Sequence, residues 1–130
     1  VEGAEMTVGI VDRRALPALQ IIPAVEYYDY EAKYARNDTR YSFDLDLPEQ
    51  TLAAMSSDAV AIYEGVGCRH LGRVDFIVDG AGRPWFLEIN TMPGFTRHSL
   101  LPMAAAEAGL GMAALCDRLV RLAIEDPLGR

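Results

Sequence analysis

Apolar residues recur along the chain in two kinds of pattern, and the first kind predicts strands. Residues 6–11 and 19–25 are short runs rich in β-branched side chains, and the polar turn of residues 12–14 separates them. Residues 74–78 and 85–89 alternate in the same way around a glycine-rich turn, which is typical of a β-hairpin. We therefore expect the two early strands and the hairpin to share one antiparallel sheet.

The second kind of pattern has helical spacing and predicts three helices. The first begins at Pro48 and ends at Gly65 and Gly67, and its apolar stripe comprises Leu52, Met55, Ala59, Ile62 and Val66. A second helix is expected over residues 99–108, with Gly109 beyond its end. The third, which Pro127 ends, has Met112, Leu115, Leu119 and Leu122 on one face. Helices packed against an antiparallel sheet make the predicted fold class α+β.

Residues 26–47 follow neither period. This segment mixes tyrosines with charged residues and is longer than most connections between elements. Its aromatic content argues against disorder, because aromatic side chains are scarce in disordered chains. We interpret the segment as an ordered functional loop.

Composition and charge exclude several classes of protein. With 130 residues, 51% of them hydrophobic and 24% charged, the chain suits one globular domain over residues 1–130. A net charge of -7 without a Lys/Arg cluster excludes nucleic acid as the main partner. No apolar run is long enough to span a membrane. Cys68 and Cys116 form no metal-binding motif and are expected to be reduced, buried thiols in a cytoplasmic protein, Cys116 on the apolar side of the last helix.

The predicted hairpin brings acidic side chains together. If its loop is residues 80–83, the cross-strand pairs are Asp79 with Pro84, Asp75 with Glu88, and Arg73 with Asn90. Two carboxylates about 5 Å apart repel by roughly 3 kcal/mol at an effective dielectric near 20. A positive charge is therefore expected between Asp75 and Glu88.

Two sources of that charge remain open. Arg73 could supply it on a solvated face, or a divalent metal could bind there together with a nucleotide. Ile77 and Phe86 are expected on the same face and favour a covered cleft. Two carboxylates and a carboxamide suit Mg²⁺, and oxygen ligands suit Mn²⁺ equally well.

Residues 91–96 follow Asn90 directly and lead to Ser99 at a predicted helix start. Exposed backbone N–H groups before a helix N-terminus are a ready anion site, although Ser99 could simply cap the helix. Lys33 could pair with phosphate or be solvated, and His98 is more typical of a structural imidazole. No phosphate-binding P-loop and no Rossmann glycine fingerprint is present.

Four stretches together resemble a known family. YYDYEAKY (27–34), GRVDF (72–76), FLEINTMPGFT (86–96) and HSLLPMAA (98–105) are similar to the C-terminal part of bacterial D-alanine:D-alanine ligases of the ATP-grasp superfamily. The resemblance implies that ATP phosphorylates one D-alanine carboxylate and that the amine of a second D-alanine attacks the acyl phosphate. It also implies that the dipeptide serves peptidoglycan synthesis, and hence cell shape, and that the reaction is cytoplasmic.

The resemblance also implies residue roles. The metal ligands would be Asp75, Glu88 and Asn90, holding two Mg²⁺ (or Mn²⁺) ions, with Glu88 bridging both. ATP would be bound by Glu5 at the ribose and by Lys33 at the terminal phosphate, with Tyr34 fixing the loop over the closed site. Arg73 and the backbone N–H of Gly94 would stabilise the oxyanion, and Ser99 with the Leu100 backbone would bind the second D-alanine.

The resemblance leaves alternatives to ligation of two D-alanines. The second substrate could be D-lactate or D-serine, or the chain could be a Mg-ATP-binding module without turnover. Family members carry an N-terminal and a central domain before this region, so the chain is interpreted as a fragment that does not complete a catalytic cycle. The full-length enzyme is expected to be a homodimer through contacts outside this region.

Overall fold

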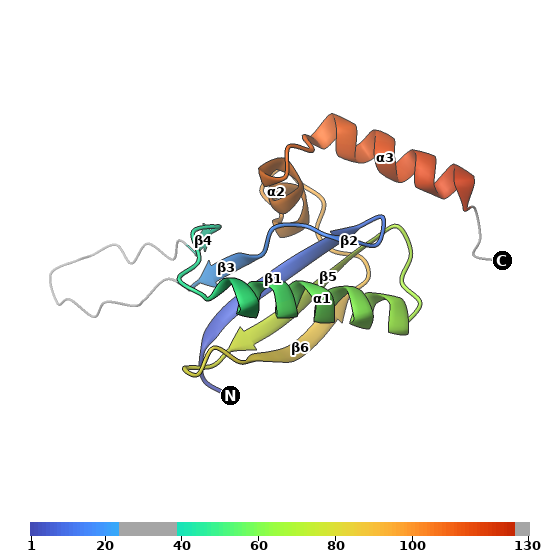
Figure 1. Ribbon diagram of the computed structural model, residues 1–130. Helices are drawn as coiled ribbons and strands as arrows, with labels where there is room; N and C mark the ends of the chain where they lie inside the picture. The colour runs from blue at the N-terminus through green and yellow to red at the C-terminus, as the bar shows by residue number, and fades with distance from the viewer. Residues whose placement is uncertain (24–38, 127–130) are drawn as a thin grey trace, which may run out of the picture.

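A computed structural model of the chain describes residues 1–23 and 39–126, and within them the strands form one antiparallel sheet (Figure 1). The sheet runs in the order β4-β3-β1-β5-β6, and β2 also pairs with β1. The strands are β1 (Ala4–Val11), β2 (Arg14–Ala15), β3 (Leu19–Ile22), β4 (Arg40–Ser42), β5 (Leu71–Val78) and β6 (Pro84–Asn90).

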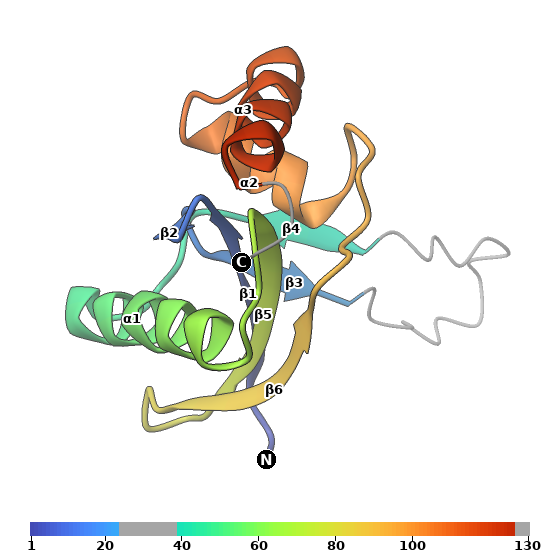
Figure 2. The same ribbon diagram turned by 90° about the vertical axis from the view of Figure 1, so that its right-hand side faces the viewer.

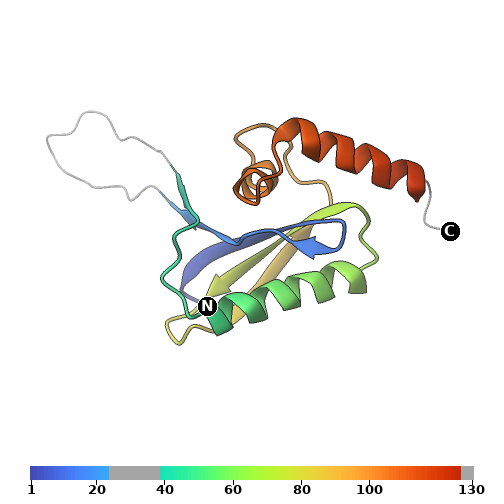
Figure 3. The ribbon, with the colours of Figure 1, turned by 45° about the horizontal axis from the view of Figure 1, so that its top comes forward.

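Helices cover both faces of the sheet, as Figures 1, 2 and 3 show together. Helix α1 (Glu49–Gly65) lies along one face, and α2 (Leu100–Glu107) lies on the other with α3 (Met112–Glu125) beside it. The predicted α+β class and the three predicted helices are confirmed. The observed limits of the helices lie within two residues of the predicted ones.

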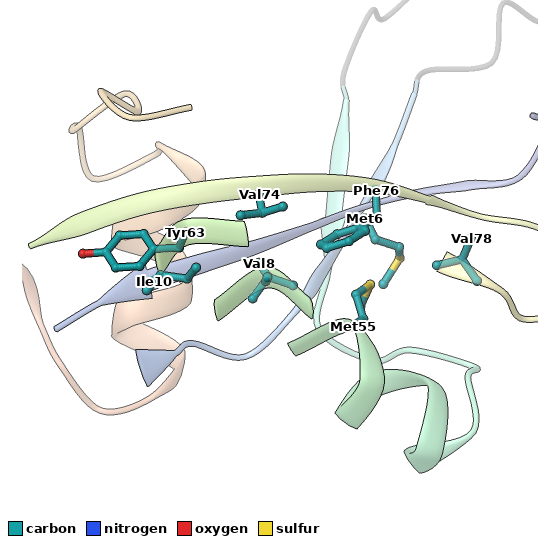
Figure 4. Packing of buried hydrophobic residues seen from close by; sticks show 9 residues of the cluster. Met6, Val8, Ile10, Met55, Tyr63, Val74, Phe76 and Val78 are labelled. Atoms are coloured by element: carbon teal, nitrogen blue, oxygen red, sulfur yellow. The ribbon is translucent and has the colours of Figure 1, made fainter. Parts of the chain in front are cut away.

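The central strand β1 determines which side chains face which helices. It pairs with β5 over its whole length, from Ala4 opposite Val78 to Val11 opposite Leu71. Because side chains alternate along a strand, one set from each strand points to α1. Figure 4 shows this cluster, which comprises Met6, Val8, Ile10, Met55, Ala59, Tyr63, Val74, Phe76 and Val78.

A second cluster lies under α2 and α3. It joins buried residues of β1, β3, both helices and the residue after β2, namely Val11, Leu16, Leu19, Leu101, Ala104, Ala105 and Leu115. Gly9 lets α2 approach the sheet closely, because a Cβ at Gly9 would lie 3.1 Å from Leu16 Cδ1 and 3.5 Å from Leu101 Cγ. The backbone of α2 therefore packs closely against β1 at Gly9.

Two details of the helix predictions are wrong. Val66 is 58% exposed, and the buried position at the end of α1 belongs to Tyr63 instead. The ring of Tyr63 packs over Gly72, where a Cβ would lie 3.0 Å from Tyr63 Cδ2. Cys116 is exposed rather than part of the core, because α3 buries only a narrow stripe around Leu115 and Leu122. Both cysteines are free, as predicted, but Cys68 is half-buried rather than fully buried.

The segment expected to be a loop over residues 26–47 contains a strand. Strand β4 pairs with β3, with Gln20 opposite Ser42 and Ile22 opposite Arg40. A strand of three residues is too short to show an alternation of apolar and polar positions. Strand β4 is therefore specified by its pairing with β3 and not by its local sequence. Residues 24–38 of this segment lie outside the described residues.

The hairpin between β5 and β6 has a longer turn than predicted. Pro84 lies opposite Val78, not Asp79, and the Asp79 backbone N–H donates to the Arg83 carbonyl. A β-bulge at Asp75/Phe76 then shifts the register by one residue. The Asp79 side chain organises the turn by accepting hydrogen bonds from the backbone N–H groups of Ala81 and Arg83 and from Trp85 Nε1.

No single helix in the described ranges has the length and apolar character to cross a membrane. Helices α2 and α3 meet those criteria only as a pair, and the pair is bent by 104°.

Asp79→Asn is expected to destabilise the protein at neutral pH. The Trp85 hydrogen bond and the backbone donors lower the pKa of Asp79 in the folded state. A lowered folded pKa stabilises the fold above the unfolded pKa of about 4, and the effect disappears as the pH falls through the folded pKa. Thermal unfolding followed by circular dichroism should show a lower Tm for Asp79→Asn at pH 7 and a difference that shrinks below about pH 4.

Asp58→Asn, at an exposed position on α1, is the matched control and should leave Tm unchanged at either pH. A constant Tm difference between Asp79→Asn and the native chain across this range would contradict the role given to the Asp79 carboxylate.

Candidate functional site

The β-bulge brings the acidic residues of the hairpin into register. Beyond it, Asp75 lies opposite Glu88 and Arg73 lies opposite Asn90, as predicted. On β1, Thr7 is opposite Asp75 and Gly9 is opposite Arg73. These positions share the sheet face that α2 covers at one end, away from the α1 cluster. The result is a polar strip across three strands.

The predicted placement of Phe86 is wrong. Before the bulge Phe86 lies opposite Phe76, and their rings meet edge to face with centroids 6.5 Å apart. Phe76 belongs to the α1 cluster, so Phe86 is on that face. Trp85 lies opposite Ile77 and is the aromatic residue on the face of the polar strip. The prediction assumes that side chains alternate between the two faces along the whole of β6, and the bulge interrupts this alternation.

A bidentate ion pair neutralises the one buried carboxylate of the strip. Arg73 Nε donates to Asp75 Oδ1 at 3.0 Å, and Arg73 Nη2 donates to Asp75 Oδ2 at 2.9 Å. Asp75 is 5% exposed. The hydrogen bond to Asp75 raises the pKa of Arg73, and the charges of Asp75, Glu88 and Glu5 raise it further against the effect of burial. Arg73 is therefore permanently charged and close to all three carboxylates.

Glu88 and Glu5 are exposed, and neither carboxylate has a hydrogen-bond or ion-pair partner among the described residues. Both contribute to the electrostatic field at Arg73. Glu5 is two residues before Thr7 on β1 and thus on the same face. Asn90 Oδ1 accepts a hydrogen bond from the Met92 backbone N–H at 3.0 Å, which fixes the side chain at the strand end. The strip thus combines the paired carboxylate of Asp75 with the unpaired carboxylates of Glu5 and Glu88, whose oxygens could bind a cation.

The donor set fits a hard divalent cation by its chemistry. Within residues 1–23 and 39–126, no three His, Cys, Asp or Glu side chains gather closely enough to form a metal site by themselves. The set here contains two carboxylates and one carboxamide, and Mg²⁺ typically takes few protein oxygens and completes its shell with water and phosphate. Glu88 is free to coordinate, whereas Asp75 would share its oxygens with Arg73.

The loop after β6 leads to the start of α2 and folds back on itself there. Ser99 precedes the first turn of α2, but its side chain does not cap the helix. Ser99 Oγ instead accepts a hydrogen bond from the Thr96 backbone N–H at 2.9 Å and lies 2.8 Å from Thr96 Oγ1. Gly94 is adjacent, since a Cβ there would lie 3.1 Å from Ser99 Oγ. The loop thus joins Gly94 and Ser99.

The hydroxyl groups of Thr96 and Ser99 have complementary roles. The His98 backbone N–H donates to Thr96 Oγ1 at 3.3 Å. If Thr96 then donates its proton to Ser99 Oγ, the Ser99 proton is directed outward and can bind an anion. Leu100 begins α2, and its N–H is among those left without an intrahelical acceptor. His98 is exposed, and its contact with Thr96 is made by the backbone N–H, so the structural role predicted for its imidazole stays a prediction.

Lys33 and Tyr34 lie outside the described residues. Of the other predicted residues, Glu5, Arg73, Asp75, Glu88 and Asn90 share the strip, and Gly94, Ser99 and Leu100 meet at the start of α2. Sequence reasoning missed Thr7, which is 1% exposed and donates a hydrogen bond to Asp75 Oδ1 at 2.5 Å. The alternation of β1 could have placed it on the polar face, between the apolar Met6 and Val8.

Comparison with known proteins agrees with this architecture. Residues 1–121 match the family described as D-ala D-ala ligase C-terminus. A D-alanine–D-alanine ligase of Laribacter hongkongensis is 49% identical over 123 residues, which are 95% of this chain and 40% of that protein. A Dechloromonas aromatica D-alanine–D-alanine ligase is 47% identical, over 97% of this chain and 42% of that protein.

Solved structures show the same fold. The D-alanine–D-alanine ligase of Bacillus anthracis superimposes with a TM-score of 0.83 at 34% identity, over 96% of this chain and 41% of that one. The same enzyme complexed with ATP gives a TM-score of 0.81. The VanG D-Ala:D-Ser ligase of Enterococcus faecalis gives 0.78 at 26% identity, over 94% and 36% of the two chains.

These neighbours define the fold as that of the ATP-grasp ligases. Within that class, the chain belongs to the family of D-alanine–D-alanine ligase C-terminal domains. It spans about two fifths of the length of the curated relatives it matches.

Gly9→Ala is expected to destabilise the domain by separating α2 from β1. The added methyl group would contact Leu16 and Leu101, and overpacking of this kind typically costs about 1–3 kcal/mol. Chemical denaturation followed by circular dichroism measures the free energy of unfolding. Gly65→Ala is the control, because no atom lies within 4 Å of the added Cβ, and it should cause no loss. Equal stabilities of Gly9→Ala and Gly65→Ala would refute the close approach.

Proposed function

We propose that this chain forms the metal-, phosphate- and acceptor-binding part of an ATP-dependent D-alanine–D-alanine ligase. The proposed reaction transfers the terminal phosphoryl group of ATP to the carboxylate of one D-alanine, giving an acyl phosphate and ADP. The amine of a second D-alanine then attacks the acyl carbon, and inorganic phosphate leaves. Use of ATP and formation of a peptidoglycan precursor imply a cytoplasmic reaction.

The observation that carries the proposal is the pairing of Asp75 with Glu88 across β5 and β6, with Arg73 and Asn90 one pair further along. This places two carboxylates, a carboxamide and a guanidinium on one rigid surface. Phosphoryl transfer needs such a surface, because its catalysis consists mainly of positioning and charge stabilisation.

Asp75, Glu88 and Asn90 are proposed to hold two divalent cations, Mg²⁺ or Mn²⁺, with Glu88 shared between them. Glu88 suits the shared position, since it has no other partner among the residues described. When bound, such ions would supply positive charge that neutralises the charge developing on the phosphate during transfer. Glu5, exposed on the same face, is proposed to bind the ATP ribose.

Arg73 and the Gly94 backbone N–H are proposed to stabilise the oxyanion formed when the amine attacks. Arg73 suits this role because its pKa is raised and it remains charged at any working pH. As the family resemblance implies, Lys33 is proposed to contact the terminal phosphate, and Tyr34 is proposed to help fix the loop over the closed site. Preorganised donors of this kind typically contribute a factor of about 10²–10³ each.

Ser99 and the Leu100 backbone N–H are proposed to bind the carboxylate of the second D-alanine. The uncapped start of α2 supports this, because free N–H groups and the helix dipole favour an anion there. The closeness of Gly94 to Ser99 supports an acceptor site beside the proposed oxyanion site. The acceptor amine would then lie close to the acyl carbon.

Glu88→Ala is expected to remove Mg-ATP binding at the hairpin and to lower dipeptide synthesis about a thousand-fold, because metal-ion stabilisation is worth several kcal/mol. Calorimetric titration of Mg-ATP and a phosphate-release assay on the ligase containing this chain measure the two effects. Glu64→Ala, an exposed glutamate of α1, is the control and should behave as the native protein.

Unchanged Mg-ATP affinity in Glu88→Ala would refute the metal assignment. ATP binding by the native protein that does not respond to D-alanine would instead identify a nucleotide-binding module without turnover.

Ligation to D-serine is a second candidate, favoured by the similarity to the VanG D-Ala:D-Ser ligase. The higher identities to D-alanine–D-alanine ligases favour D-alanine as the acceptor. Competition among D-alanine, D-serine and D-lactate as second substrates, analysed by mass spectrometry of the products, separates these reactions. A predominant D-alanyl-D-serine product would replace the first proposal by the second, and a predominant D-lactate product would contradict both.

Thr96→Val is expected to raise the KM for the second D-alanine about 2- to 12-fold, as loss of one net hydrogen bond predicts. Without the Thr96 hydroxyl, Ser99 loses the partner that directs its proton outward. The KM for ATP should not change. Steady-state kinetics with each substrate varied provide the measurement. Thr51→Val removes a comparable threonine bond, to the Gly82 carbonyl in the hairpin turn, and should leave both KM values unchanged.

A further inference from the structure

Thr7 makes a buried hydrogen bond at the centre of the polar strip. It lies directly opposite Asp75, and both residues are at least nine-tenths buried. Thr7 Oγ1 is 2.5 Å from Asp75 Oδ1 and 3.4 Å from the Val74 carbonyl oxygen. A hydroxyl has one proton to donate, and the shorter distance together with the negative charge assigns it to Asp75.

The two oxygens of Asp75 are consequently unequal. Among the described residues, Oδ1 accepts from both Thr7 Oγ1 and Arg73 Nε, whereas Oδ2 accepts from Arg73 Nη2 alone. An ionised carboxylate has about four acceptor positions, two on each oxygen. Oδ1 is therefore fully used within the protein, and Oδ2 keeps one position free.

We propose that Thr7 is a positioning residue for the metal site, which holds Asp75 by Oδ1 so that Oδ2 is the oxygen presented to a divalent cation. The inference rests on the proposed function, because it assumes that Asp75 and Glu88 bind metal. Buried partners that orient a ligand commonly change metal affinity 10- to 100-fold when they are removed.

The same geometry makes Arg73 a competitor for the metal. Its Nη2 is bonded to Oδ2, and its charge lies close to Glu88 and Glu5 as well. A cation arriving at Oδ2 must share that oxygen with the guanidinium. Thr7 is uncharged and bonds to the other oxygen, so it retains the carboxylate without opposing the cation. Removal of Thr7 and of Arg73 should therefore change metal affinity in opposite directions.

The test is Mn²⁺ binding to the ligase containing this chain, in the absence of ATP, followed by the electron paramagnetic resonance of free Mn²⁺. Thr7→Val keeps the shape of the buried side chain but removes the hydroxyl, and the Kd for Mn²⁺ should rise about 10- to 100-fold. Thr7→Ser keeps the hydroxyl and should restore the Kd to within about 3-fold of the native value. Arg73→Gln should lower the Kd.

Each result has a distinct meaning. Equal Mn²⁺ affinity in folded Thr7→Val and native protein would overturn the inference, as would failure of Thr7→Ser to restore it or weaker binding by Arg73→Gln. If Thr7→Val does not fold, Thr7→Ala provides the same measurement. Glu88→Gln tests the underlying function separately: unchanged Mn²⁺ binding there would refute the metal site itself, whatever Thr7 does.

Discussion

The antiparallel pairing of β1 with β5 is the constraint on which the rest of the structure depends. Eight consecutive residue pairs fix the register, and a slip by one residue would exchange the two faces. With this register, one face of both strands carries only apolar residues and is sealed by α1. The other face brings Thr7 opposite Asp75 and leaves Gly9 small enough for α2 to approach. Core and site are thus two faces of the same ladder.

The site extends this ladder at a cost that the ion pair offsets. A buried carboxylate is unfavourable unless it is paired and hydrogen-bonded. Asp75 satisfies both conditions through Arg73 and Thr7, which come from its own strand and from β1. The bulge at Asp75/Phe76 then brings Glu88 opposite Asp75 while Phe86 stays on the α1 face. A regular hairpin with the observed turn of residues 79–83 would instead have put Leu87 opposite Asp75 and moved Glu88 to the α1 face.

Much of this arrangement could be predicted from the sequence, because alternation and helical spacing are local properties. The pairs of Asp75 with Glu88 and of Arg73 with Asn90 were predicted correctly, although the assumed turn was wrong, because the bulge restores the register that a shorter turn would have produced. The bulge and the short strand β4 depend on pairing with other strands. Neither produces a periodic pattern that could be recognised in the sequence. Thr7 was missed for a similar reason: threonine is an ordinary strand residue, and only its partner gives it a role.

The charges of the strip bear on how an acidic chain could bind the anionic substrates proposed for it. Among the described residues of the strip, Glu5, Asp75 and Glu88 are balanced only by Arg73, so the strip alone is negative and would repel a polyphosphate. One divalent cation would neutralise it, and two would make it positive. The carboxylate of an amino acid could then approach at the start of α2, where the uncapped N–H groups add a partial positive charge. With the proposed metal site, metal binding would precede ATP binding or accompany it, and the cation held by Asp75 would set the charge that a polyphosphate meets.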